Sequence, residues 1–516
     1  MMHPPDSTQA ERAPNNIWQS GLGWAAVVAL LRLLLYVWIG PRYGYFRDEL
    51  YYLACGHHPA WGYVDQPPMI AWMAWLLEHS IGTSLYALRL LPALAGAGTI
   101  FLCGWLAKEF GGGRRAVLVA ALAALCTPIY LAMSHLFSMN AFDPLLWMAA
   151  AAVLVRAAKT GNENVWIWLG PVVGFALLNK YGVAFFTLGL LAGILLTPMR
   201  SAFLNLRLWA GAAIGAAIAM PNFLWQWHRG FPFLQLMHAI RASGRDTWNG
   251  VPWFLGQQAQ ILHPLNVVLI AGALIFWFGP RGKAFRSLGW AFLATFLLLM
   301  AMHAKNYYLA PMYPMVLAGG AVWLGSVRYR WIVPAFSAVL IASGILLSPI
   351  AVPVLTVNQY LRYTHALGIA PPKFENNRPG LLPQLYADMF GWEPMAQKVA
   401  AYYNSLPDEE RARTGIFANN YGEAGAIDFF GPRYGLPPAI SGHQNYWYWG
   451  AHGYTGESLI VLGDNEATLK KECSSVTTAA VLDDKYARRD EIGSVFHCRG
   501  LKWNLADDWA RVKKWN

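Results

Sequence analysis

Long apolar blocks, separated by short polar stretches, dominate the first 356 residues of the chain. Three of these blocks, residues 116–133, 288–302 and 331–355, contain no charged side chain. A helix needs about 20 consecutive apolar residues to cross the ~30 Å hydrocarbon core of a bilayer. The pattern therefore predicts an α-helical membrane protein, and a soluble enzyme with a very apolar core is the alternative.

The apolar blocks predict about eleven membrane-spanning helices, which form an all-α membrane domain over residues 1–356. Two of the blocks are short and predict a tilted or re-entrant hairpin around residues 179–182. The predicted spans are residues 18–40, 85–107, 116–134, 143–158, 165–179, 182–197, 208–224, 252–279, 288–303, 309–326 and 332–355.

Charge in the connecting loops predicts the orientation of the chain. One set of loops is short and basic, and short cytoplasmic loops carry an excess of Lys and Arg. We therefore expect a multi-pass protein of the cytoplasmic (inner) membrane, with a cytoplasmic N-terminus. The loop 41–84 and the region after residue 356 then lie outside, in the periplasm. The basic residues that set this orientation are Lys108, Arg114, Arg115, Arg156, Lys159, Arg200, Arg207, Arg281, Lys283, Arg286, Arg328 and Arg330.

Residues 357–516 differ in character from the preceding part, because charged residues become frequent. Residues 393–405 predict an amphipathic helix with Met395, Val399 and Tyr402 on one face. Residues 415–418, 459–462 and 494–497 predict short strands. Helices alternate with strands, so we expect a small extracytoplasmic α/β domain.

Composition excludes several classes of protein. Of the 516 residues, 56% are hydrophobic and 13% are charged, about half the ~25% charge of soluble domains. The net charge of +11 is explained by the basic loops, and no nucleic-acid-binding motif accompanies it. The sequence has neither a P-loop nor a dinucleotide-binding fingerprint. We therefore expect no cofactor; a divalent metal is compatible with the sequence but is not indicated.

Five cysteines are present, and two of them, Cys473 and Cys498, lie in the C-terminal region. Outside the cytoplasm these two can form a disulfide; two free thiols are the alternative. Cys55, Cys103 and Cys126 lack the spacing of metal ligands and predict packing roles.

The loop after the first apolar block carries an unusual group of charges. Arg47, Asp48 and Glu49 follow one another among several tyrosines. Ionisable groups near hydrocarbon are costly, so they are candidates for function. A carboxylate at the membrane surface can deprotonate an acceptor hydroxyl or amine. The alternative is helix capping, because acidic residues in a first turn favour the helix dipole.

A second candidate carboxylate is Asp143, on the predicted outer side of a span. Because Pro144 suits the first turn of a helix, Asp143 can simply be its N-cap. Asp143 nevertheless lies on the same predicted membrane face as Asp48, so the two carboxylates can share one pocket.

Basic and aromatic residues form a third candidate group on the same predicted face. Lys305 and Arg229 can hold a phosphate, and Tyr308 can donate a hydrogen bond to it. Interfacial anchoring is the alternative, since Lys, Tyr and Trp are common at membrane boundaries. The aromatic stretch 443–449 can stack on sugar rings or form a core strand of the C-terminal domain.

Several motifs, taken in order, resemble bacterial members of glycosyltransferase family 39, related to protein O-mannosyltransferases and the lipid A aminoarabinose transferase. The resemblance covers nearly the whole chain. The motifs are Asp48-Glu49, residues 65–69 (DQPPM), 179–182 (NKYG), 305–314 (KNYYLAPMYP), 390–393 (FGWE) and 420–425 (NYGEAG).

The resemblance implies a GT-C fold and an inverting transfer of a sugar from a polyprenyl phosphate. It implies that Asp48 is the catalytic base, with Glu49 its acidic neighbour and Asp143 the second acidic position. Arg47, Lys305, Tyr308 and Arg229 would then bind the donor phosphate. Relatives near the aminoarabinose transferase often have Lys before the Pro-Pro pair, where this chain has Gln66. We therefore expect Asp65 and Gln66, together with His228 and Lys180, to bind sugar or acceptor.

Two other classes of function compete with a glycosyltransferase. A transporter or flippase of a lipid-linked sugar predicts functional charges near mid-bilayer and an internal repeat, whereas these charges lie at the ends of spans and no repeat is evident. A non-catalytic assembly or sensor protein would tolerate loss of Asp48. The expected partners are a polyprenyl-phosphate-linked sugar, a lipid, glycan or protein acceptor, and membrane lipids, but no nucleic acid.

Overall fold

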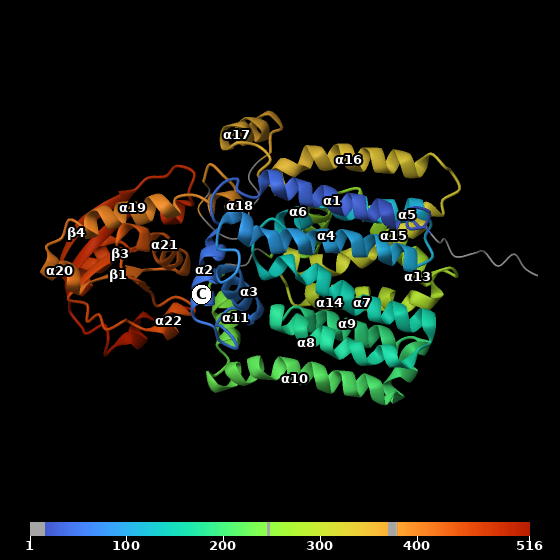
Figure 1. The fold of residues 1–516 in the computed structure, drawn as a ribbon, viewed down its shortest axis with the longest axis horizontal. Coiled ribbons are helices and arrows are strands. Elements are labelled where there is room, and N and C mark those ends of the chain that lie inside the picture. Colours follow the sequence, from blue (N-terminus) through green and yellow to red (C-terminus); the bar gives the residue numbers. More distant parts are fainter. Residues whose placement is uncertain (1–15, 245–247, 370–377, 379, 516) are drawn as a thin grey trace, which may run out of the picture.

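The computed structural model describes residues 16–244, 248–369, 378 and 380–515. It is elongated, with a bundle of helices at one end and a smaller α/β part at the other (Figure 1). The helices of the bundle are α1 (Leu22–Ile39), α4 (Leu85–Glu109), α5 (Arg114–Leu125), α6 (Pro128–Met133), α7 (Asp143–Thr160), α8 (Leu169–Asn179), α9 (Val183–Leu195), α10 (Leu206–His228), α12 (Val251–Leu262), α13 (Asn266–Phe278), α14 (Arg286–Ala301), α15 (Tyr313–Gly325) and α16 (Ile332–Ala351).

Short helices lie at the end of the bundle that faces the α/β part (Figure 1). Two of them belong to the first polar loop, which is thus folded rather than extended. These short helices are α2 (Arg47–His57), α3 (Met69–Glu78), α11 (Pro232–Ala242), α17 (Val357–Ala366) and α18 (Gln384–Ala387).

The structure has fewer membrane-spanning helices than the eleven predicted. Within the described residues, six helices are long and apolar enough to cross a membrane, and up to eight spans result if each bent pair counts as one. The six are α1, α4, α7 with its preceding turn, α10, α14 with its preceding turn, and α16. All six coincide with predicted spans.

The other five predicted spans are helical but short or broken. Pro128 begins α6 directly after the break that ends α5, and α12 and α13 are bent by 103° around His263 and Pro264. A second bent pair, at 109°, joins α9 to residues 198–204. Proline removes a helical hydrogen bond and clashes with the preceding turn. Apolar length therefore predicted where helices occur, but not which of them are continuous.

Helices α8 and α10 approach each other unusually closely through glycines. A Cβ atom added to Gly170 would lie 1.7 Å from the carbonyl oxygen of Gly211, and one added to Gly174 would lie 2.6 Å from that of Gly215. Small residues allow such backbone contact between membrane helices. The opposite face of α10 is exposed, since only 22% of its apolar window is buried.

The C-terminal part is an α/β domain, as predicted. Its five-stranded sheet has the order β2-β1-β3-β5-β4, with β1 parallel to β2 and β3, and β5 antiparallel to β3 and β4. The strands are β1 (Thr414–Ala418), β2 (Ala439–Ile440), β3 (Ser458–Leu462), β4 (Cys473–Leu482) and β5 (Gly493–Leu501), and the helices are α19 (Trp392–Tyr403), α20 (Asp408–Arg413), α21 (Tyr421–Phe430), α22 (Tyr446–Trp449) and α23 (Glu466–Glu472).

The predicted helix at 393–405 is α19, and the three predicted strands lie within β1, β3 and β5. The longest strand, β4, was not predicted, because its Ser and Thr residues leave it largely exposed and weaken the apolar alternation. The aromatic stretch 443–449 ends in the short helix α22 rather than in the core strand considered above.

The first loop and the C-terminal domain share one hydrophobic core. Leu50 and Tyr52 of α2 are buried together with Ala424 and Ile427 of α21. Gly425 permits the close contact, since a Cβ atom there would lie 3.0 Å from the backbone of Leu50. Helix α2 is thus fixed between the two parts. The domain boundary near residue 356 falls between α16 and α17, and it stays a prediction.

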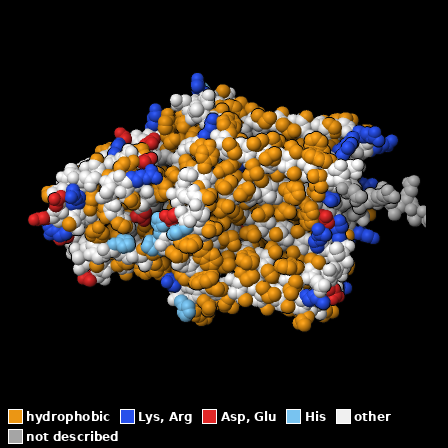
Figure 2. Space-filling view, in the orientation of Figure 1, with side chains coloured by type: hydrophobic (Ala, Val, Ile, Leu, Met, Phe, Trp, Pro, Cys, Tyr) orange, Lys and Arg blue, Asp and Glu red, His pale blue; other side chains and the backbone are white. Residues whose placement is uncertain are grey.

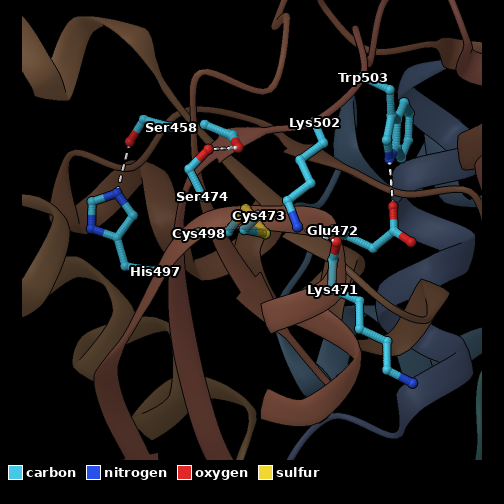
Figure 3. Close-up of a disulfide and its surroundings, with 10 residues drawn as sticks. Ser458, Lys471, Glu472, Cys473, Ser474, His497, Cys498, Lys502 and Trp503 are labelled. Atoms are coloured by element: carbon cyan, nitrogen blue, oxygen red, sulfur yellow. Dashed lines mark hydrogen bonds between the residues drawn. A yellow bond between two sulfur atoms is a disulfide. The ribbon is translucent and has the colours of Figure 1, made fainter.

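A disulfide joins Cys473, at the start of β4, to Cys498 in β5 (Figure 3). The two Cα atoms are 5.7 Å apart, within the usual range for a disulfide. The bridge closes a stretch of 25 residues, which stabilises the sheet by restricting the unfolded chain. The other three cysteines are buried free thiols.

Apolar side chains cover the visible surface of the helical bundle, while Lys and Arg gather at the end opposite the C-terminal domain (Figure 2). This distribution is that of a membrane-embedded bundle with one basic end. Which side each terminus occupies stays a prediction, and residues 1–15 lie outside the described part of the chain.

Candidate active site

The charged triplet Arg47-Asp48-Glu49 forms the start of helix α2, and its two carboxylates lie in different environments. Successive helical residues point about 100° apart, so Asp48 and Glu49 face different neighbours. The Glu49 side chain is 0% exposed, whereas the Asp48 side chain is 30% exposed. The two acidic residues that the sequence groups together therefore cannot have the same role.

Glu49 is fully occupied by protein partners. Its Oε1 accepts hydrogen bonds from Arg89 Nε at 3.1 Å and from the backbone N–H of Phe137 at 2.9 Å. Its Oε2 accepts from Arg89 Nη2 at 3.0 Å and from the backbone N–H of Phe46 at 2.8 Å. Glu49 thus ties α2 to α4 and caps the start of α2, and it has no side facing a substrate.

Asp48 lies at the seam between the membrane bundle and the C-terminal domain. The Tyr421 hydroxyl, from the first residue of α21, donates to Asp48 Oδ1 at 2.8 Å. Arg47 Nη2 donates to the same hydroxyl at 2.9 Å, and Arg47 Nε is 3.7 Å from Asp48 Oδ1. Burial raises the pKa of Tyr421 well above its usual value. The phenol therefore keeps its proton and donates a hydrogen bond to the carboxylate.

Asp65 lies near Asp48 and Tyr421, and its pKa is raised. The Tyr51 hydroxyl donates to Asp65 Oδ1 at 3.0 Å, and the Tyr51 ring lies 4.7 Å from that of Tyr421. The pKa of Asp65 is raised to about 7, mainly by burial and in part by the charge of Asp48, against hydrogen bonds that lower it. Asp65 can therefore carry or release a proton near neutral pH.

Gln66, next to Asp65, is the more deeply buried of the two. Its side chain is fully buried, and its Nε2 lies 3.6 Å from the sulfur of Cys55. Gln66 therefore packs inside the first loop, and its contact with sugar or acceptor stays a prediction.

Asp143 belongs to a separate cluster. Asn179 Nδ2 donates to Asp143 Oδ1 at 2.7 Å, and Lys180 Nζ lies 3.8 Å from Asp143 Oδ2. Lys180 also donates to Asn140 Oδ1 at 2.5 Å. Asp143 and Asp48 thus have different partners. The motif at residues 179–182 holds Asp143 and Lys180 together.

Lys180 and two tyrosines meet beside Asp143, and a second lysine, Lys305, acts on Lys180 through its charge. Lys180 Nζ lies 4.9 Å from the ring centre of Tyr308 and 5.3 Å from that of Tyr307. Burial lowers the pKa of Lys180, Asp143 raises it, and the charge of Lys305 lowers it. Lys305 therefore lies within electrostatic range of Lys180. Cationic and phenolic groups arranged in this way suit a phosphate.

Arg229 and His228 lie elsewhere, at the end of α10. The Arg229 guanidinium is 4.6 Å from the ring centre of Trp225 and 5.4 Å from that of Tyr448, distances typical of cation–π contacts. Arg229 thus contacts aromatic rings of α10 and of the C-terminal domain, and a phosphate shared by Arg229 and Lys305 stays a prediction.

Across the residues described, no three His, Cys, Asp or Glu side chains are grouped so as to hold a metal ion. Two residues that define the site, Arg89 and Tyr421, were not predicted from the sequence. Arg89 lies inside an apolar span, where a charge signals a buried partner. Tyr421 falls in the motif at residues 420–425, but the sequence could not show that α21 packs on α2.

Comparisons with known proteins bear on this arrangement. A family model described as dolichyl-phosphate-mannose-protein mannosyltransferase matches residues 65–225. The lipid A galacturonosyltransferase RgtD of Rhizobium johnstonii is 30% identical over 185 residues, which are 35% of this chain and 38% of that protein. The putative mannosyltransferase YycA of Bacillus subtilis is 29% identical over 169 residues, 31% of this chain and 24% of that protein. The matches thus span well under half of these curated relatives.

Solved structures with low sequence identity share the fold. ArnT from Cupriavidus metallidurans, bound to undecaprenyl phosphate, has a TM-score of 0.59 and 15% identity over 92% of this chain and 98% of that chain. The arabinofuranosyltransferase AftD from Mycobacteria has a TM-score of 0.51 and 15% identity over 93% of this chain and 40% of that chain. The predicted GT-C fold is confirmed, with the smaller number of spans given above.

Proposed function

We propose, from the confirmed resemblance to glycosyltransferase family 39, that this protein is an integral-membrane glycosyltransferase. It would move a sugar from a polyprenyl phosphate to an acceptor on the membrane side that carries the C-terminal domain. The matching relatives are described as galacturonosyl- and mannosyltransferases, and ArnT was solved with undecaprenyl phosphate. The observation that carries the proposal is the partly exposed Asp48 carboxylate, held at the seam by Tyr421 and Arg47.

Asp48 would act as the general base. Both Tyr421 and Arg47 approach Oδ1, so Oδ2 can accept the proton of the acceptor. As that proton leaves, the acceptor atom forms a bond to the anomeric carbon of the donor. The bond between that carbon and the phosphate oxygen breaks, and its electron pair leaves with the phosphate. Attack from the face opposite the phosphate inverts the configuration at the anomeric carbon.

The departing phosphate would bind at Lys180, Lys305 and Tyr308. Fixed positive groups stabilise the negative charge that develops on a leaving group. Asp143 would orient Lys180 rather than act as a second base, since its carboxylate lies 3.8 Å from the Lys180 ammonium. Arg47 would position Asp48 through Tyr421, in place of the phosphate contact expected from sequence.

Replacing Lys305 by Ala should raise the KM for the donor about tenfold or more. A hydrogen bond to a charged group contributes ~1.5–3 kcal/mol, and each 1.4 kcal/mol changes affinity tenfold. Lys180→Ala should also raise the KM for the donor. The measurement is initial-rate transfer with a polyprenyl-phosphate sugar at varied concentration.

Lys283→Ala is the matched control, because Lys283 lies just before α14, away from the Lys180 cluster. Its donor KM should equal that of the unmodified protein. An unchanged donor KM in both the Lys305 and Lys180 variants would contradict the phosphate assignment.

Tyr421→Phe should lower kcat about tenfold or more with little change in either KM. The variant keeps the ring that packs on Tyr51 but removes the hydroxyl that donates to Asp48 and accepts from Arg47. A hydrogen bond to a charged group contributes ~1.5–3 kcal/mol. Losing that much stabilisation of the transition state lowers the rate about tenfold or more. Steady-state kinetics with both substrates varied would measure it.

Tyr434→Phe serves as the comparison, because Tyr434 also donates to a carboxylate of the C-terminal domain, that of Glu393. It should retain the full kcat. If the two variants were equally active, the C-terminal domain would have no part in orienting Asp48.

A further inference from the structure

A long cavity follows one face of helix α10. Its volume is about 890 Å³, and its lining is mostly small or apolar. Ala213, Ala217, Met220 and Leu224 recur at the spacing of one helical face, and Trp61 of the first loop also lines the cavity. This face lies opposite the glycine contacts with α8, so the cavity opens toward the surrounding lipid.

The apolar part of the cavity matches one leaflet of a bilayer in length. Ala213 and Leu224 are eleven positions apart in the helix, which is ~16 Å at 1.5 Å per residue. The hydrocarbon core is ~30 Å thick, so half of it is of similar length. Three of the lining residues, Ala213, Ala216 and Ala217, are alanines, whose small side chains leave room along this face. A lipid chain of a single leaflet fits these dimensions.

The end of the cavity nearest the C-terminal domain is positively charged. Arg229 and His228 line it, and the rings of Trp225 and Tyr448 hold the Arg229 guanidinium. No carboxylate within the described parts of the chain forms an ion pair with Arg229. A cation at the end of an apolar cavity complements a lipid whose headgroup is negatively charged.

The charged end is fixed to the loop that carries Asp65. Asn222 Nδ2 donates to the carbonyl oxygen of Trp61 at 2.8 Å, and Gln226 Nε2 donates to that of Tyr63 at 2.9 Å. Asp65 follows two residues after Tyr63, and the charge of Asp48 reaches it. A headgroup bound beside Arg229 would therefore lie next to the loop that leads to the proposed base.

We infer that the cavity along α10 binds the acceptor, and that the acceptor is a membrane lipid with an anionic headgroup. Its chain would lie against Ala213 to Leu224, and its negative group would contact Arg229. The inference rests on the proposed function. It assigns Arg229 to the acceptor, because Lys180 and Lys305 form the separate cluster assigned to the donor phosphate.

Photo-crosslinking tests the binding site without relying on catalysis. The full-length protein would be placed in phosphatidylcholine nanodiscs with a small fraction of phosphatidic acid carrying a diazirine on its acyl chain. Peptide mass spectrometry should find labelling of residues 213–225, at least threefold above that given by diazirine phosphatidylcholine. Arg229→Ala should remove this excess, while Arg207→Ala, at the other end of α10, should not. Equal labelling by both probes, or no effect of Arg229→Ala, would overturn the site.

A second variant connects the site to the reaction. Ala217→Trp should fill the cavity and reduce labelling by phosphatidic acid at least threefold. It should reduce sugar transfer to an anionic lipid acceptor equally, while the KM for the donor stays unchanged. Lost labelling with full transfer would show that the cavity binds lipid but not the acceptor. Failure of the proposed function itself would appear separately, as no sugar transfer by the unmodified protein whatever the labelling result.

Discussion

Replacing Asp48 by Asn should lower kcat for sugar transfer by about 10²–10⁴-fold, the usual contribution of a general base. The amide keeps the shape of the side chain but cannot take the proton of the acceptor. Asp48 is partly exposed and lies outside the buried ion pair of its neighbour, so the variant should fold normally. Single-turnover transfer with saturating donor would measure the change in the chemical step.

Asp408→Asn is the matched control, because the Asp408 side chain is 87% exposed on the C-terminal domain. This variant should transfer sugar at the full rate. The role of Asp48 would be excluded if Asp48→Asn retained more than about a tenth of the normal kcat, since a general base contributes far more than tenfold.

Replacing the adjacent Glu49 by Gln should have a different and equally large effect, on stability. The change leaves the Arg89 guanidinium, which is fully buried, without its charged partner. Breaking a buried ion pair by removing one partner costs about 3–5 kcal/mol. The neutral side chain also weakens the bonds from the backbone N–H groups of Phe46 and Phe137. We expect a clearly lower thermal unfolding temperature in detergent and a lower yield of folded protein.

Asp48→Asn is the control for this second experiment, because it changes the neighbouring carboxyl in the same way. Its unfolding temperature should match that of the unmodified protein. An undisturbed unfolding temperature for Glu49→Gln, combined with lost transfer, would instead indicate that Glu49 takes part in the reaction.

Hydropathy predicted the general architecture because membrane burial depends on apolar composition, which the sequence shows directly. It could not predict where helices break. Pro128 and Pro264 lie within apolar stretches that composition treats as continuous, and each coincides with a break. The exposed strand β4 was missed for the opposite reason, since its pairing with β5 fixes it despite a weak apolar pattern.

At the candidate site, too, features local in the sequence could be predicted, whereas contacts between distant residues could not. The sequence identified Asp48 and Glu49 as an acidic pair, but only distant contacts separate their environments. Arg89 is 40 positions from Glu49, and Tyr421 is 373 positions from Asp48. Likewise, Lys180 and Asp143 meet through the turn between α8 and α9, a contact between residues that lie 37 positions apart. The kind of chemistry at the site could therefore be predicted from the residue types in the sequence. The partners of each side chain, by contrast, are set by the fold.

The central claim is that the protein transfers a sugar from a polyprenyl phosphate with Asp48 as base. The most direct test incubates the purified protein and its Asp48→Asn variant with a panel of polyprenyl-phosphate sugars and a membrane lipid extract, with mass spectrometry of the products. We predict that the unmodified protein consumes one donor, releases free polyprenyl phosphate and adds one sugar to an acceptor, and that the variant does not. Consumption of no donor, or equal product from the variant, would contradict the account.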